Sequence, residues 1–148
     1  MKKNIWFPAL LTLTFFAFAA YGSATADNHK KLKTVDGSFE AALEYAAETQ
    51  KPVFVMAHAE WCGACRRLER NTLSDGEVIG FMNANFVNFD FDIEKGEGPE
   101  LVEKFNIQRT PSLLFITPDG EVFHSFTGYK NARNFLSEAD EAAKKFEN

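Results

Sequence analysis

Hydrophobic and polar residues follow two recurring periods along this chain, one helical and one typical of strands. Residues 38–50 carry apolar side chains at helical spacing, and Ser38 stands where a helix N-cap is expected. Lys51 and Pro52 interrupt this pattern, and residues 53–59 are then apolar at almost every position. Such a run predicts a short central strand that is buried on both faces of a sheet.

The segments after this strand are also short. A helix is expected to begin at Cys62 and to end near residue 72. Ser74 is followed by Glu77 three residues later, a spacing that predicts a capping box at the start of a second helix through residue 82. Residues 86–93 alternate as a strand of mixed burial does. Residues 99–105 are predicted to form a short helix with Pro99 near its start.

The C-terminal part predicts a hairpin and a closing helix. Residues 112–117 and 121–126 are strand-like, and Pro118-Asp119-Gly120 between them is a turn sequence. Residues 131–146 have the pattern of an amphipathic helix. One domain with a three-layer α/β/α architecture and a central mixed β-sheet is therefore predicted.

The first 26 residues differ from the remainder of the chain. Lys2 and Lys3 precede a long uncharged stretch over residues 5–21, and Ala24-Thr25-Ala26 places small residues where a signal peptidase cleaves. This layout predicts a cleaved signal peptide over residues 1–26 and a mature domain over residues 27–148. The alternative is an uncleaved membrane anchor, but the stretch is short for a span and contains Pro8. No retention signal ends the chain, so the periplasm is the expected location.

Composition and charge narrow the class of protein. Hydrophobic residues make up 45% of the chain and charged residues 25%, as in globular domains. Residues 27–148 hold 14 basic and 21 acidic residues, a net charge of −7. No block of like charges is present, so no nucleic-acid partner is expected. A monomer is the expected state.

The chain contains two cysteines, Cys62 and Cys65, and a disulfide framework usually needs four or more. Two cysteines three residues apart at the start of a helix share one face, and a modest adjustment brings them to bonding distance. A loop this small gains little stability from cross-linking. The spacing therefore favours a bond that is made and broken.

The two cysteines are predicted to have unequal roles. Cys62 at the helix N-terminus would have a lowered thiol pKa and act as the nucleophile. Cys65 would then resolve the mixed disulfide. A static structural disulfide and a zinc site remain alternatives, although zinc usually takes four ligands and His29, His58 and His124 show no ligand spacing. No metal and no cofactor beyond the Cys62–Cys65 pair are expected.

Beyond this pattern, several segments of residues 51–136 resemble the thioredoxin superfamily. The resemblance is strongest to exported thioredoxin-like proteins and to the soluble C-terminal domain of the bacterial transmembrane thiol:disulfide interchange protein. It rests on an ordered set of motifs: Lys51-Pro52-Val53, Ala59-Glu60-Trp61-Cys62-Gly63-Ala64-Cys65, Asn71-Thr72-Leu73-Ser74-Asp75, Phe105-Asn106-Ile107-Gln108-Arg109-Thr110-Pro111-Ser112, Leu113-Leu114-Phe115, Pro118-Asp119-Gly120 and Gly128.

The resemblance implies a site and a function. Pro111 would be cis and lie beside the cysteines, and Thr110 would offer backbone groups to an extended substrate. Trp61, Gly63 and Ala64 would be further substrate contacts. The implied activity is reduction or exchange of disulfides in oxidised periplasmic proteins, with a membrane thiol carrier as electron donor. A disulfide-donating oxidase and a non-catalytic binding module, chaperone-like or metal-carrying, remain alternatives.

Three positions depart from the superfamily pattern. Met56 stands where thioredoxins have a buried aspartate, and Asn88 stands where they have the facing lysine. Ala64 replaces the usual proline between the cysteines. The first two departures predict that water or a more exposed acid such as Glu60 takes the proton of Cys65, and the third bears on the redox potential.

Overall fold

Four strands form one mixed sheet, in the order β2-β1-β3-β4, in the computed structural model, which describes residues 31–148. Strand β1 (Val53–His58) pairs in parallel with β2 (Val87–Asp92) and antiparallel with β3 (Ser112–Ile116), and β4 (Val122–Thr127) completes a hairpin with β3. The predicted mixed sheet is confirmed. The expected signal peptide lies outside the described residues.

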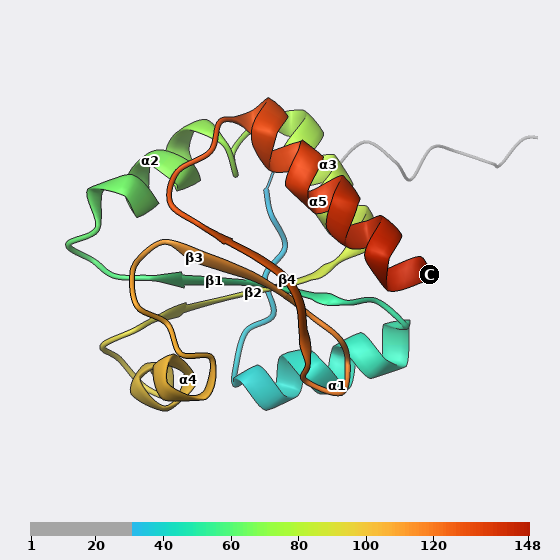
Figure 1. Ribbon diagram of the computed structural model, residues 1–148, viewed down its shortest axis with the longest axis horizontal. Helices are drawn as coiled ribbons and strands as arrows, with labels where there is room; N and C mark the ends of the chain where they lie inside the picture. The colour runs from blue at the N-terminus through green and yellow to red at the C-terminus, as the bar shows by residue number, and fades with distance from the viewer. Residues whose placement is uncertain (1–30) are drawn as a thin grey trace, which may run out of the picture.

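Helices cover both faces of this sheet (Figure 1). One face carries α1 (Phe39–Thr49) and α4 (Gly98–Lys104). The other carries α2 (Gly63–Asn71), α3 (Gly76–Asn85) and α5 (Ala132–Glu147). The three-layer architecture is therefore as predicted. None of the helices within residues 31–148 has the length and apolar character needed to cross a bilayer.

The sequence of the central strand β1 does not alternate between apolar and polar residues, because the strand is buried on both faces. Val53, Val55 and Ala57 pack into the cluster beneath α1 and α4, whereas Phe54 and Met56 pack into the cluster on the opposite face. Because both faces are buried, each residue of β1 except the last is apolar. Strand β2 differs, since Asn88 and Asp90 occupy positions in register with Phe54 and Met56.

Two N-caps were predicted from the sequence, at Ser38 and at Ser74. Ser38 caps α1 as predicted, since its side chain accepts a hydrogen bond from the Ala41 amide. The capping box at Ser74 is wrong: the N-cap of α3 is Asp75, whose carboxylate accepts from the amides of Glu77 and Val78. The Ser74 hydroxyl instead donates to the Arg70 carbonyl at 2.6 Å, so it is engaged at the end of α2.

Candidate active site

A short turn joins the end of β1 to the start of α2 and places both cysteines. Cys62 is the N-cap of α2, in extended backbone conformation, and Gly63 is the first helical residue. The Cys62 amide donates to the Ala59 carbonyl at 3.0 Å, which holds the turn closed. The predicted helix start is therefore correct to within one residue.

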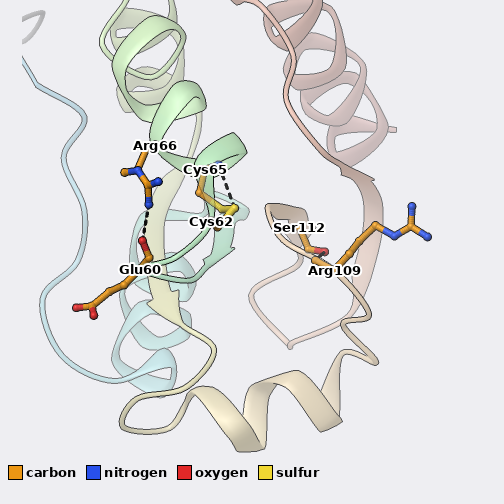
Figure 2. Close-up of a disulfide and its surroundings, with 6 residues drawn as sticks. All are labelled: Glu60, Cys62, Cys65, Arg66, Arg109 and Ser112. Atoms are coloured by element: carbon orange, nitrogen blue, oxygen red, sulfur yellow. Dashed lines mark hydrogen bonds between the residues drawn. A yellow bond between two sulfur atoms is a disulfide. The ribbon is translucent and has the colours of Figure 1, made fainter.

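Cys62 and Cys65 are joined by a disulfide, with their Cα atoms 5.3 Å apart (Figure 2). Cys62 is 4% exposed and Cys65 is 1% exposed, so the second cysteine is the more deeply buried of the two. Both belong to the buried cluster that packs beneath α2, α3 and α5. The expected roles, in which Cys62 meets the substrate and Cys65 lies behind it, stay a prediction.

The first turn of α2 provides the electrostatics of the site. The Cys65 amide donates to the Cys62 sulfur at 3.1 Å. Amides at a helix N-terminus have no partner within the helix and carry partial positive charge. An anionic sulfur at Cys62 would be stabilised by both, which lowers a thiol pKa. The arrangement can therefore supply a thiolate nucleophile in the reduced state.

The expected substrate contacts lie around this turn. Trp61 is 64% exposed, Gly63 is exposed and Ala64 is half-buried. The Thr110–Pro111 peptide bond is cis, as the resemblance implies. The buried Thr110 hydroxyl has no hydrogen-bond partner in the part of the chain that the structure describes.

The loop before β3 is fixed close to the end of β1. Ser112 pairs with Ala57 in the sheet, and the Ser112 hydroxyl donates to the Arg109 carbonyl at 2.7 Å. The Gly128 amide donates to the Pro111 carbonyl at 2.8 Å, which ties the loop to the end of β4. Figure 2 shows the loop that holds Arg109 and Ser112 across from the disulfide, on the side opposite Glu60.

The region beneath Cys65 has a methionine where the superfamily has an acid. Met56 is 3% exposed and lies in the same buried cluster as both cysteines. Asn88 is equally buried and donates to the Lys33 carbonyl at 3.1 Å, but its own side-chain oxygen has no partner within residues 31–148. A cavity of about 400 Å³ reaches these two residues, and the acids on its lining are Glu69 and Asp90.

Two polar contacts near the site were not found from the sequence. Glu60, named with water as a candidate proton acceptor, is exposed and ion-paired with Lys95, which raises the pKa of that lysine. His58 lies 3.4 Å from Asp90, measured from Nε2 to Oδ2, and its hydrogen bond with this carboxylate raises the pKa of the imidazole. Both contacts join residues on different elements, so sequence spacing gives no signal for them.

The sequence also missed a third polar cluster, far along the chain from the cysteines. His124 on β4 lies within 4.8 Å of carboxylates from Glu138 and Glu141 on α5. Lys130 pairs with Glu138 at 2.7 Å and Lys145 pairs with Glu141 at 2.7 Å. Because both carboxylates are already paired with lysines, a metal ion would have to compete with these lysines. We therefore interpret the cluster as an ion-pair network that joins β4 to α5.

The chain is similar to known proteins in both sequence and structure. A family model described as a thioredoxin-like domain matches residues 39–143. The thiol:disulfide interchange protein DsbD of Yersinia pestis is 28% identical over 124 residues, which cover 82% of this chain and 21% of that protein. The chain thus spans about a fifth of the length of the curated relatives it matches.

Solved structures give the same family. A Bacteroides thetaiotaomicron protein, provisionally described as a disulphide-isomerase, is 35% identical with a TM-score of 0.69 and covers 78% of this chain and 95% of its own. A thioredoxin from Thermus thermophilus is 28% identical with a TM-score of 0.68, over 73% of this chain and 85% of its own. These matches and the bonded Cys62–Cys65 pair support thiol–disulfide oxidoreductase activity.

Proposed function

Because this chain belongs to the thioredoxin-like domain family, we propose that it is a periplasmic thiol–disulfide oxidoreductase that reduces or exchanges disulfides in exported proteins. The observation that carries the proposal is the position of the Cys62–Cys65 bond at the N-terminus of α2. There, one sulfur accepts an amide hydrogen bond and the other is more deeply buried. The interchange proteins among its relatives support the same chemistry.

The reaction begins from the reduced pair. The Cys62 thiolate attacks one sulfur of the substrate disulfide, the substrate S–S bond breaks, and the leaving sulfur takes a proton. Cys65 then loses its proton and attacks the Cys62 sulfur. The Cys62–Cys65 bond forms, and the second substrate sulfur leaves as a thiol. Two electrons pass to the substrate, and a membrane thiol carrier would return two electrons to the chain.

The neighbouring residues have binding roles in this proposal. Trp61 offers an exposed ring beside the cysteines, and Gly63 and Ala64 lie on the first turn of α2. Thr110 would bind an extended substrate segment through its backbone, next to Pro111. The fixed position of this loop beside β1 supports that role. No metal and no cofactor beyond the cysteine pair is part of the proposed reaction.

The sequence supports a proposal for the location and processing of the chain. Residues 1–26 are proposed to be removed as a signal peptide, which leaves residues 27–148 in the periplasm as a monomer. The basic start, the uncharged stretch and the Ala24-Thr25-Ala26 site support cleavage. The intact mass of protein from the periplasmic fraction tests the cleavage site, and full-length protein in the membrane fraction would contradict it.

Reduction of insulin disulfides tests the activity. Wild type is expected to turn over insulin with dithiothreitol as reductant, and Cys62→Ser is expected to abolish turnover. Cys65→Ser should still attack and should accumulate mixed disulfides with substrate. Absence of turnover by the wild type would favour a non-catalytic binding module.

The reduction potential tests the direction of the reaction. A potential near that of thioredoxin, about −270 mV, is expected for a reductant. A potential nearer to about −120 mV would favour a disulfide-donating oxidase. Equilibration of the Cys62–Cys65 pair with glutathione, followed by alkylation and mass analysis, provides the measurement.

A further inference from the structure

All arginines of the chain lie around its redox end. The sequence contains five, Arg66, Arg67, Arg70, Arg109 and Arg133, and all five are exposed. Three lie on α2, one lies in the loop before Pro111, and one lies in the first turn of α5. These five residues are called the arginine band below. Of the lysines within residues 31–148, Lys95 and Lys130 also lie near this end, and each of them is paired with a glutamate.

The elements that carry the band are joined to each other. The Thr72 hydroxyl, at the end of α2, donates to the Lys130 carbonyl at 2.7 Å, which holds the turn before α5 beside α2 (Figure 1). The Arg67 guanidinium lies over the Tyr129 ring of the same turn, 4.7 Å from its centroid. Figure 2 shows Arg66 and Arg109 on opposite sides of the disulfide. The band therefore flanks the site on two sides.

The charges of the band have no carboxylate partner in the part of the domain that the structure describes. Within residues 31–148 every ion pair takes its cation from a lysine or a histidine, and no arginine is paired with a carboxylate. Helix α2 carries three arginines against one acid, Glu69. The surrounding domain is acidic, with a net charge of −7 over residues 27–148. The net positive charge of α2 and of the loop before Pro111 thus contrasts with the charge of the whole molecule, and the exposed Glu60 on the turn before the cysteines is already paired with Lys95.

We propose that the arginine band is the docking surface for an acidic polypeptide segment next to the cysteine pair of the partner protein. This inference rests on the proposed oxidoreductase function and names the substrate class of the same site. Arginine forms bidentate hydrogen bonds with carboxylates and remains charged at all working pH values. Because the remainder of the domain repels anions, an acidic segment is steered to the one face where exchange takes place.

Charge complementarity selects the occupant. Arg66 donates to the Glu60 carbonyl at 2.5 Å and Arg67 stacks on Tyr129, but within residues 31–148 none of the five guanidinium groups has a carboxylate partner. A basic or neutral segment offers them no carboxylate, whereas aspartates or glutamates beside the partner's disulfide can pair with them while the disulfide faces Cys62. Pairing of the guanidinium groups with carboxylates involves neither sulfur, so the band adds selectivity among disulfides without any part in the electron transfer. A negatively charged membrane surface is the competing occupant and forms one arm of the test.

The test uses peptides that contain one internal disulfide flanked by aspartates, by serines or by lysines. The reduced full-length mature protein is mixed with each peptide, and each rate is divided by the rate of the same peptide with uncharged dithiothreitol. At low ionic strength, the normalised rate for the aspartate peptide is expected to exceed that for the lysine peptide by about tenfold or more. The ratio should fall toward about two near 0.5 M salt, where exposed charges are screened.

The variant Arg70→Gln/Arg109→Gln/Arg133→Gln is expected to reduce this ratio to about threefold or less, because it removes three of the five band charges. The matched control Lys51→Gln/Lys144→Gln/Lys145→Gln lowers the net charge equally, before the start of β1 and in the last turn of α5, away from α2 and from the loop before Pro111. Its ratio should equal that of the wild type. An equal loss in both variants would mean that net charge alone is responsible, and would overturn the docking surface.

The remaining outcomes separate this inference from the proposed function. If no peptide is reduced, the oxidoreductase function itself fails. If all three peptides are reduced at equal normalised rates, the function stands and the docking surface is overturned. Sedimentation with phosphatidylglycerol vesicles completes the test: vesicle binding by the wild type but not by the arginine variant, with equal peptide rates, would assign the band to lipid and overturn a polypeptide partner.

Discussion

Met56 on β1 lies in register with Asp90 on the parallel neighbour β2. Met56 belongs to the buried cluster that also contains both cysteines. Met56 is buried, whereas the Asp90 side chain is 48% exposed and faces His58. Thioredoxins have a carboxylate on the central strand at the position of Met56, whereas on this face of the sheet the carboxylate here is Asp90, on the edge strand β2. The region beneath Cys65 is left without an acid of its own.

The resolving step is therefore expected to depend on pH. Burial disfavours a thiolate, so the pKa of reduced Cys65 should be raised. Neither Met56 nor Asn88 can accept the proton of Cys65, so water or a more exposed carboxylate, such as that of Glu60, must accept it. Decay of a preformed Cys62 mixed disulfide, followed by stopped flow, should be slow near neutral pH and accelerate as pH rises. A rate that is already fast and independent of pH would mean that Cys65 has another base.

Met56→Asp tests the same step from the opposite direction. The new carboxylate should accelerate decay near neutral pH by about tenfold or more, as a positioned general base does. It should also cost stability of several kcal/mol, or stay protonated, because it is a buried and unpaired acid. Met56→Leu conserves volume and should change the free energy of unfolding by less than about 1.5 kcal/mol. The decay rate of Met56→Leu should match the wild type.

The His58–Asp90 contact is expected to appear in an imidazole titration. The hydrogen bond with Asp90 raises the pKa of His58, opposed by desolvation and assisted by the charges of Asp90, Glu69 and Asp92. A folded pKa above the unfolded value adds stability that is fully present below the unfolded pKa and is lost as pH rises through the folded pKa. Asp90→Asn should therefore lower the pKa of His58 and destabilise the domain more at mildly acidic pH than at pH 8.

Nuclear magnetic resonance of the His58 ring measures the change in its pKa. Chemical denaturation at mildly acidic pH and at pH 8 measures the change in the free energy of unfolding. His124 lies in another ion-pair network on β4 and serves as the internal reference in the same spectra. An unchanged His58 titration in Asp90→Asn would show that the contact does not control the imidazole.

The sequence was sufficient for features that are local. Ser38 beside an apolar helical pattern, and an apolar run at β1, define elements without reference to the remainder of the chain. The helix start at Cys62 follows in the same way. At α3 the local signal was ambiguous, because Ser74 and Asp75 are both good N-caps. The structure assigns Asp75, since the Ser74 hydroxyl is bonded to the end of the preceding helix.

Contacts that depend on how the strands pair could not be predicted from the sequence. The approach of His58 to Asp90 requires a parallel pairing between strands that are separated by two helices. The arginine band is another example, because Arg66 on α2 and Arg109 in the loop before Pro111 flank the disulfide only through the fold. No spacing rule connects residues on two such segments.

Gly98 is expected to tolerate no side chain. It is the buried first residue of α4, and a Cβ atom there would lie 2.0 Å from the Asp92 carbonyl oxygen. The backbone must move to accommodate it, so Gly98→Ala should lower the free energy of unfolding by about 2 kcal/mol or more. Gly76, the first residue of α3, has no atom within 4 Å of the same position. Gly76→Ala is the matched control and should be neutral or stabilising by up to about 1 kcal/mol.

Thr72 connects the helix of the cysteines to the turn before α5. Its side chain is fully buried, and its hydroxyl donates to the Lys130 carbonyl at 2.7 Å. Thr72→Val keeps the shape of the side chain but leaves this carbonyl without its donor, which should cost about 1–3 kcal/mol in the free energy of unfolding. Thr72→Ser keeps the hydroxyl and loses only a methyl group. If the hydrogen bond carries the stability, chemical denaturation should find the valine variant less stable than the serine variant. The reverse order would show that the methyl group, packed in the core, contributes more than the hydrogen bond to holding α2 beside the turn before α5.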